Sequence, residues 1–244
     1  MEYHIMNDLA RHALELNNEA VSLMLAGEDK TAAKTLAEAL AVMQRLQHAS
    51  SSCTERKSYT TIGAVCNTRA LSSQDAGISA ASISQTRRID QCVEFHDMND
   101  VYADQMGSNF IYNPAFVLDA RPKPQRETDD LQVYSACLTF NLALIYHRRG
   151  VNRGSAHLLT KAEQAYEMGK KFVCGLSLNH RTALSVSLAA TNNISVIQFD
   201  QGHFSEARQG LNCLAYLIDS AENSRDLFSE REWDGLHLNM VCCC

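Results

Sequence analysis

The feature that most constrains this chain is a ten-residue pattern that occurs three times within its 244 residues. Residues 18–27, 141–150 and 193–202 each begin with Asn and end with Gly, with a small residue third and an apolar residue fourth. The three asparagines are Asn18, Asn141 and Asn193. Self-similarity of this kind is typical of proteins built from repeated helical units. The sequence therefore predicts one supersecondary unit used three times.

The residues around each glycine predict a pair of antiparallel helices. A small residue in the first helix lets a second helix approach closely, and glycine supplies the left-handed conformation that ends the first helix. After each glycine, apolar or small residues recur at intervals of four and three, as in a second helix. These residues are Ala32, Leu36 and Ala39, then Ala162, Tyr166 and Gly169, then Ala207, Leu211 and Leu214.

These segments resemble the tetratricopeptide repeat family. Residues 202–207, Gly-His-Phe-Ser-Glu-Ala, are similar to the family's Gly-x-Tyr-x-x-Ala turn, and residues 27–32 keep the spacing without the aromatic residue. The copies do not follow the family's period of about 34 residues. The resemblance implies an all-α fold of antiparallel hairpins of the α-solenoid type. It also implies a scaffold that binds a peptide or a helix of a partner protein in the groove of its hairpins.

Composition agrees with an all-α fold. Hydrophobic residues make up 45% of the chain, and it contains only 11 Gly and 3 Pro, which disfavours a β-fold that needs many turns. Residues 110–118 combine β-branched and aromatic residues around Pro114, and residues 236–241 alternate with period two. Both patterns indicate extended chain, so we also consider a minor two-strand element.

The expected organisation has five parts. Residues 1–48 form an N-terminal hairpin, and residues 49–88 form a flexible insertion rich in Ser and Thr. Residues 89–129 contain a short helix and the extended segment, 130–232 two further hairpins, and 233–244 a C-terminal tail. Helices within 130–228 should break near Gly150, near Gly175 and at Gly202.

The three repeated asparagines are the candidate peptide-binding residues. The resemblance places Asn18, Asn141 and Asn193 on the concave face. An amide side chain both donates and accepts hydrogen bonds, so a row of amides can bind the backbone of an extended peptide without reading its side chains. The alternative is that these amides bond within or between helices. The residues just before them include no cation, so the carboxylate clamp of the family's chaperone-tail binders is not expected.

A basic cluster lies where the first helix of the second copy is expected to end. Arg148, Arg149 and Arg153 could bind an anion there, although cations at a helix C-terminus are also favoured by the helix dipole. The acidic residues between 96 and 104 lack the glycine and the spacing of a calcium loop. We therefore predict no metal site and no cofactor.

The sequence carries no recognised catalytic signature. It has no phosphate-binding glycine loop, zinc-protease motif or serine-hydrolase motif. We therefore expect a non-enzymatic, protein-binding scaffold. The alternative is an enzyme or small-molecule binder with a polar pocket between helices, in which His147 would meet Asp200 or His203.

Charge and hydropathy limit the partners. The formal net charge of −6 disfavours nucleic acid as a partner. A membrane-spanning run and a signal-peptide pattern are both absent, so we expect a cytoplasmic protein and leave a nuclear location open. The final Cys242, Cys243 and Cys244 superficially resemble prenylated endings, but the usual four-residue motif and a basic stretch are missing. Membrane anchoring is therefore not favoured, whereas self-association through an uncovered terminal hairpin stays open.

Overall fold

The computed structural model describes residues 2–54, 110–120, 128–176, 180–221 and 226–242. Within these ranges all regular secondary structure is helical, and no strand is present. The helices are α1 (Glu2–Leu25), α2 (Asp29–Thr54), α4 (Thr128–Arg153), α5 (Ala156–Val173), α6 (Arg181–Asp200), α7 (Phe204–Ser220) and α8 (Glu230–Cys242). The prediction of an all-α chain is confirmed for these residues.

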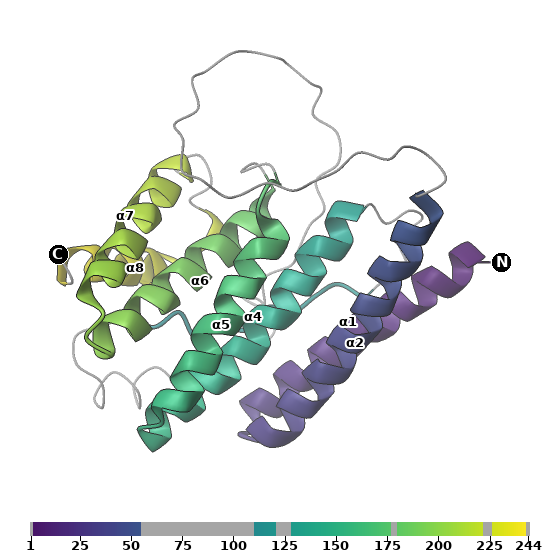
Figure 1. Cartoon of the computed structure of the whole chain (residues 1–244), viewed down its shortest axis with the longest axis horizontal. Helices are drawn as coiled ribbons and strands as arrows, with labels where there is room; N and C mark the ends of the chain where they lie inside the picture. The colour runs from purple at the N-terminus through teal and green to yellow at the C-terminus, as the bar shows by residue number, and fades with distance from the viewer. Residues whose placement is uncertain (1, 55–109, 121–127, 177–179, 222–225, 243–244) are drawn as a thin grey trace, which may run out of the picture.

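The helices pack in chain order and form a row between the two ends of the chain (Figure 1). Three pairs are formed by α1 with α2, α4 with α5, and α6 with α7. The second helix of one pair lies against the first helix of the next, α2 against α4 and α5 against α6. Helix α8 follows the last pair and contacts both α7 and α6. Each helix is thus held mainly by its neighbours in the sequence.

Two of the three repeated glycines make the turns expected of them. Gly27 and Gly202 both have φ of 79°, in the left-handed region, and separate the helices of the first and third pairs. The break predicted near Gly150 falls at Gly154, where φ is 58°, because α4 continues past Gly150 to Arg153. A Cβ at Gly150 would come within 2.8 Å of Leu159 Cδ2, so this glycine allows close packing of α4 on α5.

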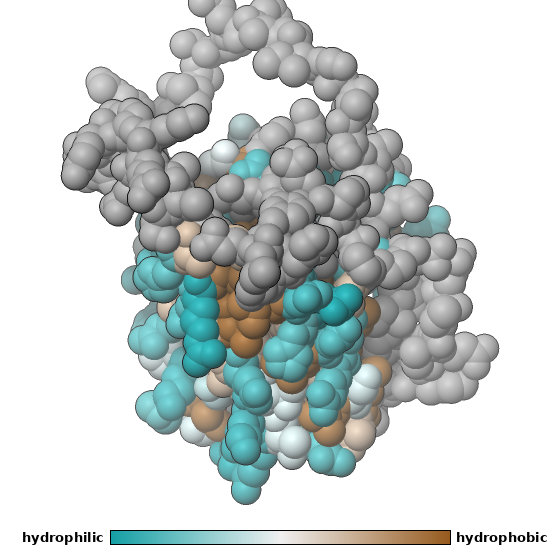
Figure 2. Space-filling view, turned by 90° about the vertical axis from the view of Figure 1, so that its right-hand side faces the viewer, coloured by the Kyte–Doolittle hydropathy of each residue, from teal (hydrophilic) through white to brown (hydrophobic). Residues whose placement is uncertain are grey.

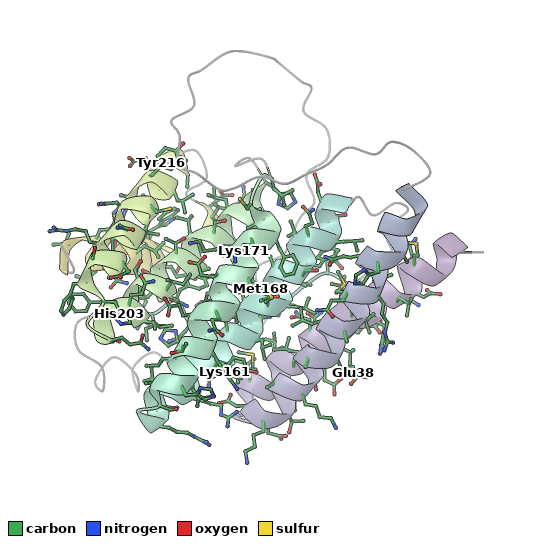
Figure 3. The ribbon with its side chains drawn as sticks, viewed as in Figure 1. Glu38, Lys161, Met168, Lys171, His203 and Tyr216 are labelled. Atoms are coloured by element: carbon green, nitrogen blue, oxygen red, sulfur yellow. The ribbon has the colours of Figure 1, made fainter. Side chains whose placement is uncertain are left out.

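The second helices of the three pairs bury the residues that the sequence pattern placed on their inner faces. All of the positions spaced by four and three residues are buried, including Gly169, which lies on the α4 backbone. The outer faces of these helices carry the exposed residues labelled in Figure 3: Glu38, Lys161, Met168, Lys171, His203 before α7, and Tyr216. The pairs are therefore amphipathic in the way the repeat predicted.

One boundary differs from the sequence-based expectation. Residues 49–54 belong to α2, so the first hairpin extends beyond residue 48. The remainder of the expected insertion, 55–88, and the helix expected between 89 and 106 lie outside the described residues.

At the end of the row formed by α1 and α2, apolar surface is visible between polar side chains (Figure 2).

The two segments expected to be extended have different conformations. Residues 110–120 form no helix and pair with no strand among the described residues. Residues 236–241 are part of α8, so the two-strand element is wrong. Leu236 and Asn239 are buried three residues apart, as on one face of a helix. In so short a window, period-two alternation and helical spacing fit the same residues.

Candidate peptide-binding site

Residues 110–118, here called the inner segment, cross the first helices of the pairs. In Figure 1 the segment is a teal trace that emerges on both sides of α4 and α5. Its backbone is hydrogen-bonded first to α8, then to α6, α4 and α1. The inner segment therefore runs opposite to the order of the helices.

Asparagine side chains bind the C-terminal half of the inner segment through its backbone. The Phe116 N–H donates to Asn141 Oδ1 at 2.8 Å, and Asn141 Nδ2 donates to the Phe116 carbonyl at 2.8 Å. The Leu118 N–H donates to Asn18 Oδ1 at 2.9 Å, and Asn18 Nδ2 donates to the Leu118 carbonyl at 2.7 Å. Each amide thus satisfies both backbone groups of one residue, much as a neighbouring β-strand would.

The N-terminal half is bound in the same way. The Tyr112 N–H donates to Asn193 Oδ1 at 2.8 Å, and Asn193 Nδ2 donates back to the Tyr112 carbonyl at 2.9 Å. Asn239 pairs with Phe110 at 2.7 Å to the N–H and 2.6 Å to the carbonyl. We call Asn18, Asn141, Asn193 and Asn239 the asparagine ladder. The extended segment thus finds its hydrogen-bonding mate in a row of side chains from four helices.

Asn17 connects the first two residues of the ladder, Asn18 and Asn141. Asn17 Nδ2 donates to the Phe116 carbonyl at 2.9 Å, so this carbonyl accepts from two amides. Asn17 Oδ1 in turn accepts a bond of 2.9 Å from Asn141 Nδ2. Because Asn17 is on α1 and Asn141 on α4, this bond orients the ladder residue of the next pair.

Asn192 repeats this arrangement two helix pairs further on. Its Nδ2 donates to the Phe110 carbonyl at 3.0 Å, and its Oδ1 accepts from Asn239 Nδ2 at 2.7 Å. The adjacent asparagines, 17 with 18 and 192 with 193, therefore act as a unit. The second asparagine of each pair binds the inner segment at its own helix. The first binds the inner segment and also the ladder residue of the next helix.

Tyr166 of α5 takes the corresponding place between α4 and α6. Its hydroxyl accepts a bond of 3.0 Å from Asn193 Nδ2 and lies 3.4 Å from His147 Nδ1. Burial raises the pKa of Tyr166, although its bond to Asn193 opposes this, and burial lowers the pKa of His147 to about 4. Both groups are therefore uncharged at neutral pH, and the tyrosine hydroxyl can donate to His147 while accepting from Asn193.

The ladder omits one alternate residue of the segment, Pro114. Phe140 occupies the position before Asn141 that asparagine occupies before Asn18 and Asn193. Its ring lies 5.0 Å from that of Phe116 and 6.0 Å from that of Tyr112, edge-on to both. Proline has no N–H to satisfy, so an aromatic contact can replace the amide bond at this point.

The asparagine ladder is almost entirely withdrawn from water. Asn141, Asn193 and Asn239 are fully buried, as are the neighbouring Asn17 and Asn192. Buried amides must be hydrogen-bonded, because each lost partner costs about 1–3 kcal/mol. The bonds to the inner segment supply these partners. The site can hold an extended backbone in one register, and backbone contacts alone do not select its sequence.

The residues of the alternative polar pocket occupy different environments. His147 is buried against Tyr166, with ring centroids 6.0 Å apart, and its Nε2 has no partner among the described residues. Asp200 and His203 are exposed at the end of α6 and before α7. The structure therefore does not gather these three groups in a common pocket.

The candidate anion-binding residues lie near the C-terminal end of α4. Arg148 and Arg149 are half-buried, and Arg153 is exposed in the last turn. This is where the helix dipole favours cations, so their placement agrees with a structural role as well as with anion binding.

Among the described residues, no group of three or more His, Cys, Asp or Glu side chains is arranged to hold a metal ion. No described helix is long and apolar enough to cross a membrane. Cys242 is the last residue of α8, and Cys243 and Cys244 lie outside the described residues.

Sequence reasoning found three of the four ladder residues and missed Asn239. A signal was present, since Leu236 and Met240 are four residues apart, as on one face of a helix, and Asn239 lies between them. No glycine follows Asn239 to mark a fourth copy. The role of the asparagines at 17 and 192 was also missed.

Comparison with family models, curated proteins and solved structures gives no match for this chain.

Proposed function

We propose that this chain is a non-catalytic scaffold of tetratricopeptide-like helical hairpins that binds an extended peptide of a partner protein along its asparagine ladder. The observation that carries the proposal is the pairing of four asparagines with both backbone groups of four residues in the inner segment. On the side of the inner segment these bonds use only main-chain atoms, so another extended peptide can form the same set of bonds.

The order of helix contacts supports a solenoid of hairpins. Helix pairs that contact mainly their neighbours build one continuous face, on which equivalent residues recur at regular intervals. The ladder residues of α1, α4, α6 and α8 are such equivalents. A repeated face with one amide per first helix fits a linear peptide better than a compact ligand.

In the single chain the site is occupied by the inner segment, which then acts as a built-in competitor. A tethered ligand has an effective concentration of about 1 mM when its linkers permit binding. A partner peptide at micromolar concentration must therefore bind about a thousandfold more tightly, or the segment must first be released. The scaffold would thus bind its partner under control of its own chain.

The test is a peptide exchange experiment on the full chain. Protease sites are inserted after residues 107 and 121, and cutting both turns the inner segment into a separate peptide. A fluorescein-labelled peptide with the sequence of residues 108–120 is then added in excess, and its anisotropy is measured. We expect the cut protein to bind the labelled peptide and the uncut protein to bind it at least a hundredfold more weakly.

A matched variant identifies the binding residues. In the cut protein, Asn141→Ala with Asn193→Ala should weaken binding at least tenfold, whereas Asn212→Ala on the exposed part of α7 should not change it. The proposal fails if the cut protein stays helical by circular dichroism yet binds no labelled peptide. It also fails if cutting unfolds the helices, because the inner segment is then part of the fold and not a ligand.

A second candidate function is self-association through α8. The residue before each ladder asparagine is fully buried in α1, α4 and α6, but its equivalent in α8, Leu238, is 46% exposed. The residue two positions after the asparagine is at most 1% exposed in those helices, whereas Val241 is 78% exposed. Helix α8 thus presents the face that the preceding first helices bury, and we propose that a second copy of the chain covers it.

Sedimentation velocity over a range of concentrations tests this association. We expect a concentration-dependent dimer that Leu238→Ser with Val241→Ser abolishes, because apolar side chains at these positions supply the contact. The control is Met168→Ser, which removes an exposed apolar side chain from α5 (Figure 3). A monomer at all concentrations would exclude this candidate.

A further inference from the structure

We infer that the peptide recognised by the asparagine ladder is uncharged and carries aromatic side chains at its first, third and seventh positions and leucine at its ninth. This inference rests on the proposed function and adds the sequence that the site selects. Its template is the inner segment, Phe110 to Leu118, in which every ladder-bound residue has a large apolar side chain. The partner is therefore a protein with an exposed linear segment of this pattern.

The third position is read by an aromatic cluster. The Tyr112 ring is buried, with its centroid 5.4 Å from that of Phe228 and 6.0 Å from that of Phe140, edge-on to both. Edge-to-face pairs are worth about 0.5–1.5 kcal/mol each beyond the area that they bury. An aliphatic or polar side chain here would lose both contacts.

The seventh position is read by the same cluster. The Phe116 ring lies 5.0 Å from Phe140 at an interplanar angle of 81°, and Phe140 in turn lies 5.1 Å from Tyr166. Phe140 therefore contacts the third and seventh residues together. A peptide with aromatic residues four apart places both rings against Phe140, stacked with their centroids 6.3 Å apart.

The first and ninth positions are recognised at the two ends of the ladder. Phe110 lies directly on Gly235 of α8, where an added Cβ would overlap its ring, so the glycine makes room for an aromatic side chain. Leu118 is buried at the α1 end, within the core that joins the helices. The two terminal positions therefore also select by shape.

The fifth position differs, because no ladder residue binds its backbone. Pro114 stands there, between the residues held by Asn193 and Asn141. A residue without an N–H loses nothing at this point, whereas proline at the first, third, seventh or ninth position would remove a ladder bond. The site therefore accepts proline at the centre of the pattern and rejects it at the four ladder-bound positions.

Charge is excluded from the whole stretch. Residues 110–118 contain no Asp, Glu, Lys or Arg, and all are buried or half-buried. Placing an unpaired charge among them would require its desolvation without compensation. Acidic and basic peptides are thus poor ligands. Because the recognised peptide takes the direction of the inner segment, its N-terminus lies toward α8.

The experiment uses the cut protein and labelled synthetic peptides derived from residues 108–120. We expect Tyr112→Ser, Phe116→Ser and Leu118→Ser peptides to bind at least tenfold more weakly than the parent. Val117→Ser, at a half-buried position outside the pattern, should change affinity less than threefold. Pro114→Ala should also stay within threefold of the parent. Phe116→Pro should bind at least tenfold more weakly, whereas Ala115→Pro, the matched proline control, should not show this loss.

The outcomes separate this inference from the proposed function. If the parent peptide does not bind the cut protein, the proposed function itself is wrong. If the parent binds and the serine peptides bind equally well, the ladder binds peptides without selecting this pattern, and only the inference is overturned. A reversed-sequence peptide that binds as well as the parent would overturn the predicted direction.

Discussion

Asn141 holds both backbone groups of Phe116, which is 25 residues away in the sequence, with two hydrogen bonds of 2.8 Å. The same amide also donates to Asn17 of the preceding helix pair. One buried side chain therefore fixes the inner segment and joins two repeats. The stability of the helix stack and the position of the segment are consequently coupled.

Replacing Asn141 by alanine should destabilise the protein by about 3 kcal/mol. The change removes three hydrogen bonds and leaves the Phe116 N–H and Asn17 Oδ1 buried without these partners, at about 1–3 kcal/mol for each unsatisfied group. Chemical denaturation followed by circular dichroism measures the loss. Asn212→Ala, at an exposed position of α7, should stay within about 0.5 kcal/mol of the parent. Equal effects of the two substitutions would contradict the buried role of Asn141.

Replacing Gly235 by alanine should destabilise the protein, although alanine normally favours a helix by about 1 kcal/mol over glycine. The added methyl group would overlap the Phe110 ring, and overpacking costs about 1–3 kcal/mol. In a double-mutant cycle, Phe110→Ala should remove most of this cost because it clears the space. The contact is refuted if Gly235→Ala is equally destabilising in both backgrounds.

The stability of the protein should fall between about pH 6.5 and pH 4 because of His147. Burial holds its folded-state pKa at about 4, below the ordinary value of 6.5. In this range the unfolded chain binds a proton that the folded chain does not, so the free energy of unfolding decreases as the pH falls. The full effect is about 3 kcal/mol, at about 1.4 kcal/mol per pH unit.

His147→Phe should reduce this pH dependence while keeping an aromatic ring against Tyr166. Urea denaturation at several pH values gives the slope for the parent and the variant. Asn212→Ala, at an exposed position of α7, serves as the control and should leave the slope as in the parent. An unchanged slope in His147→Phe would show that its titration is not the cause.

The thiol of Cys137 should be unreactive in the folded protein. It is fully buried in α4, and burial raises its pKa, so the reactive thiolate is suppressed. Cys174 and Cys213 are exposed and serve as internal references. Labelling with iodoacetamide followed by peptide mass spectrometry should modify the two exposed thiols first, and Cys137 only in denaturant. Modification of all three at one rate would contradict the packing of α4.

The local elements of the site could be predicted from the sequence, but their meeting could not. The spacing from Asn18, Asn141 and Asn193 to glycine indicated equivalent helix positions, and the residues around Pro114 indicated extended chain. The inner segment binds residues as far as 129 positions away, and no local pattern encodes such a pairing. Only the structure shows that the repeated asparagines and the segment around Pro114, which are far apart in the sequence, bind each other.

Other errors arose where one residue type fits two physical roles. Gly150 resembles the turn glycines, but it serves close helix packing, and only the neighbouring helix distinguishes the two roles. The alternation at residues 236–241 suggested a strand because the window is too short to separate periods of two and 3.6. Asn239 was missed with it, although it completes the ladder.

Amide hydrogen exchange of the intact chain, resolved by residue with NMR, tests the central claim most directly. The account predicts that Phe116 and Leu118, whose N–H groups donate to Asn141 and Asn18, exchange about a hundredfold more slowly than Ala115 and Val117. Asn141→Ala should accelerate exchange most strongly at Phe116. Uniformly fast exchange across residues 110–118 would contradict the account, because the inner segment would then not be bound by the asparagine ladder.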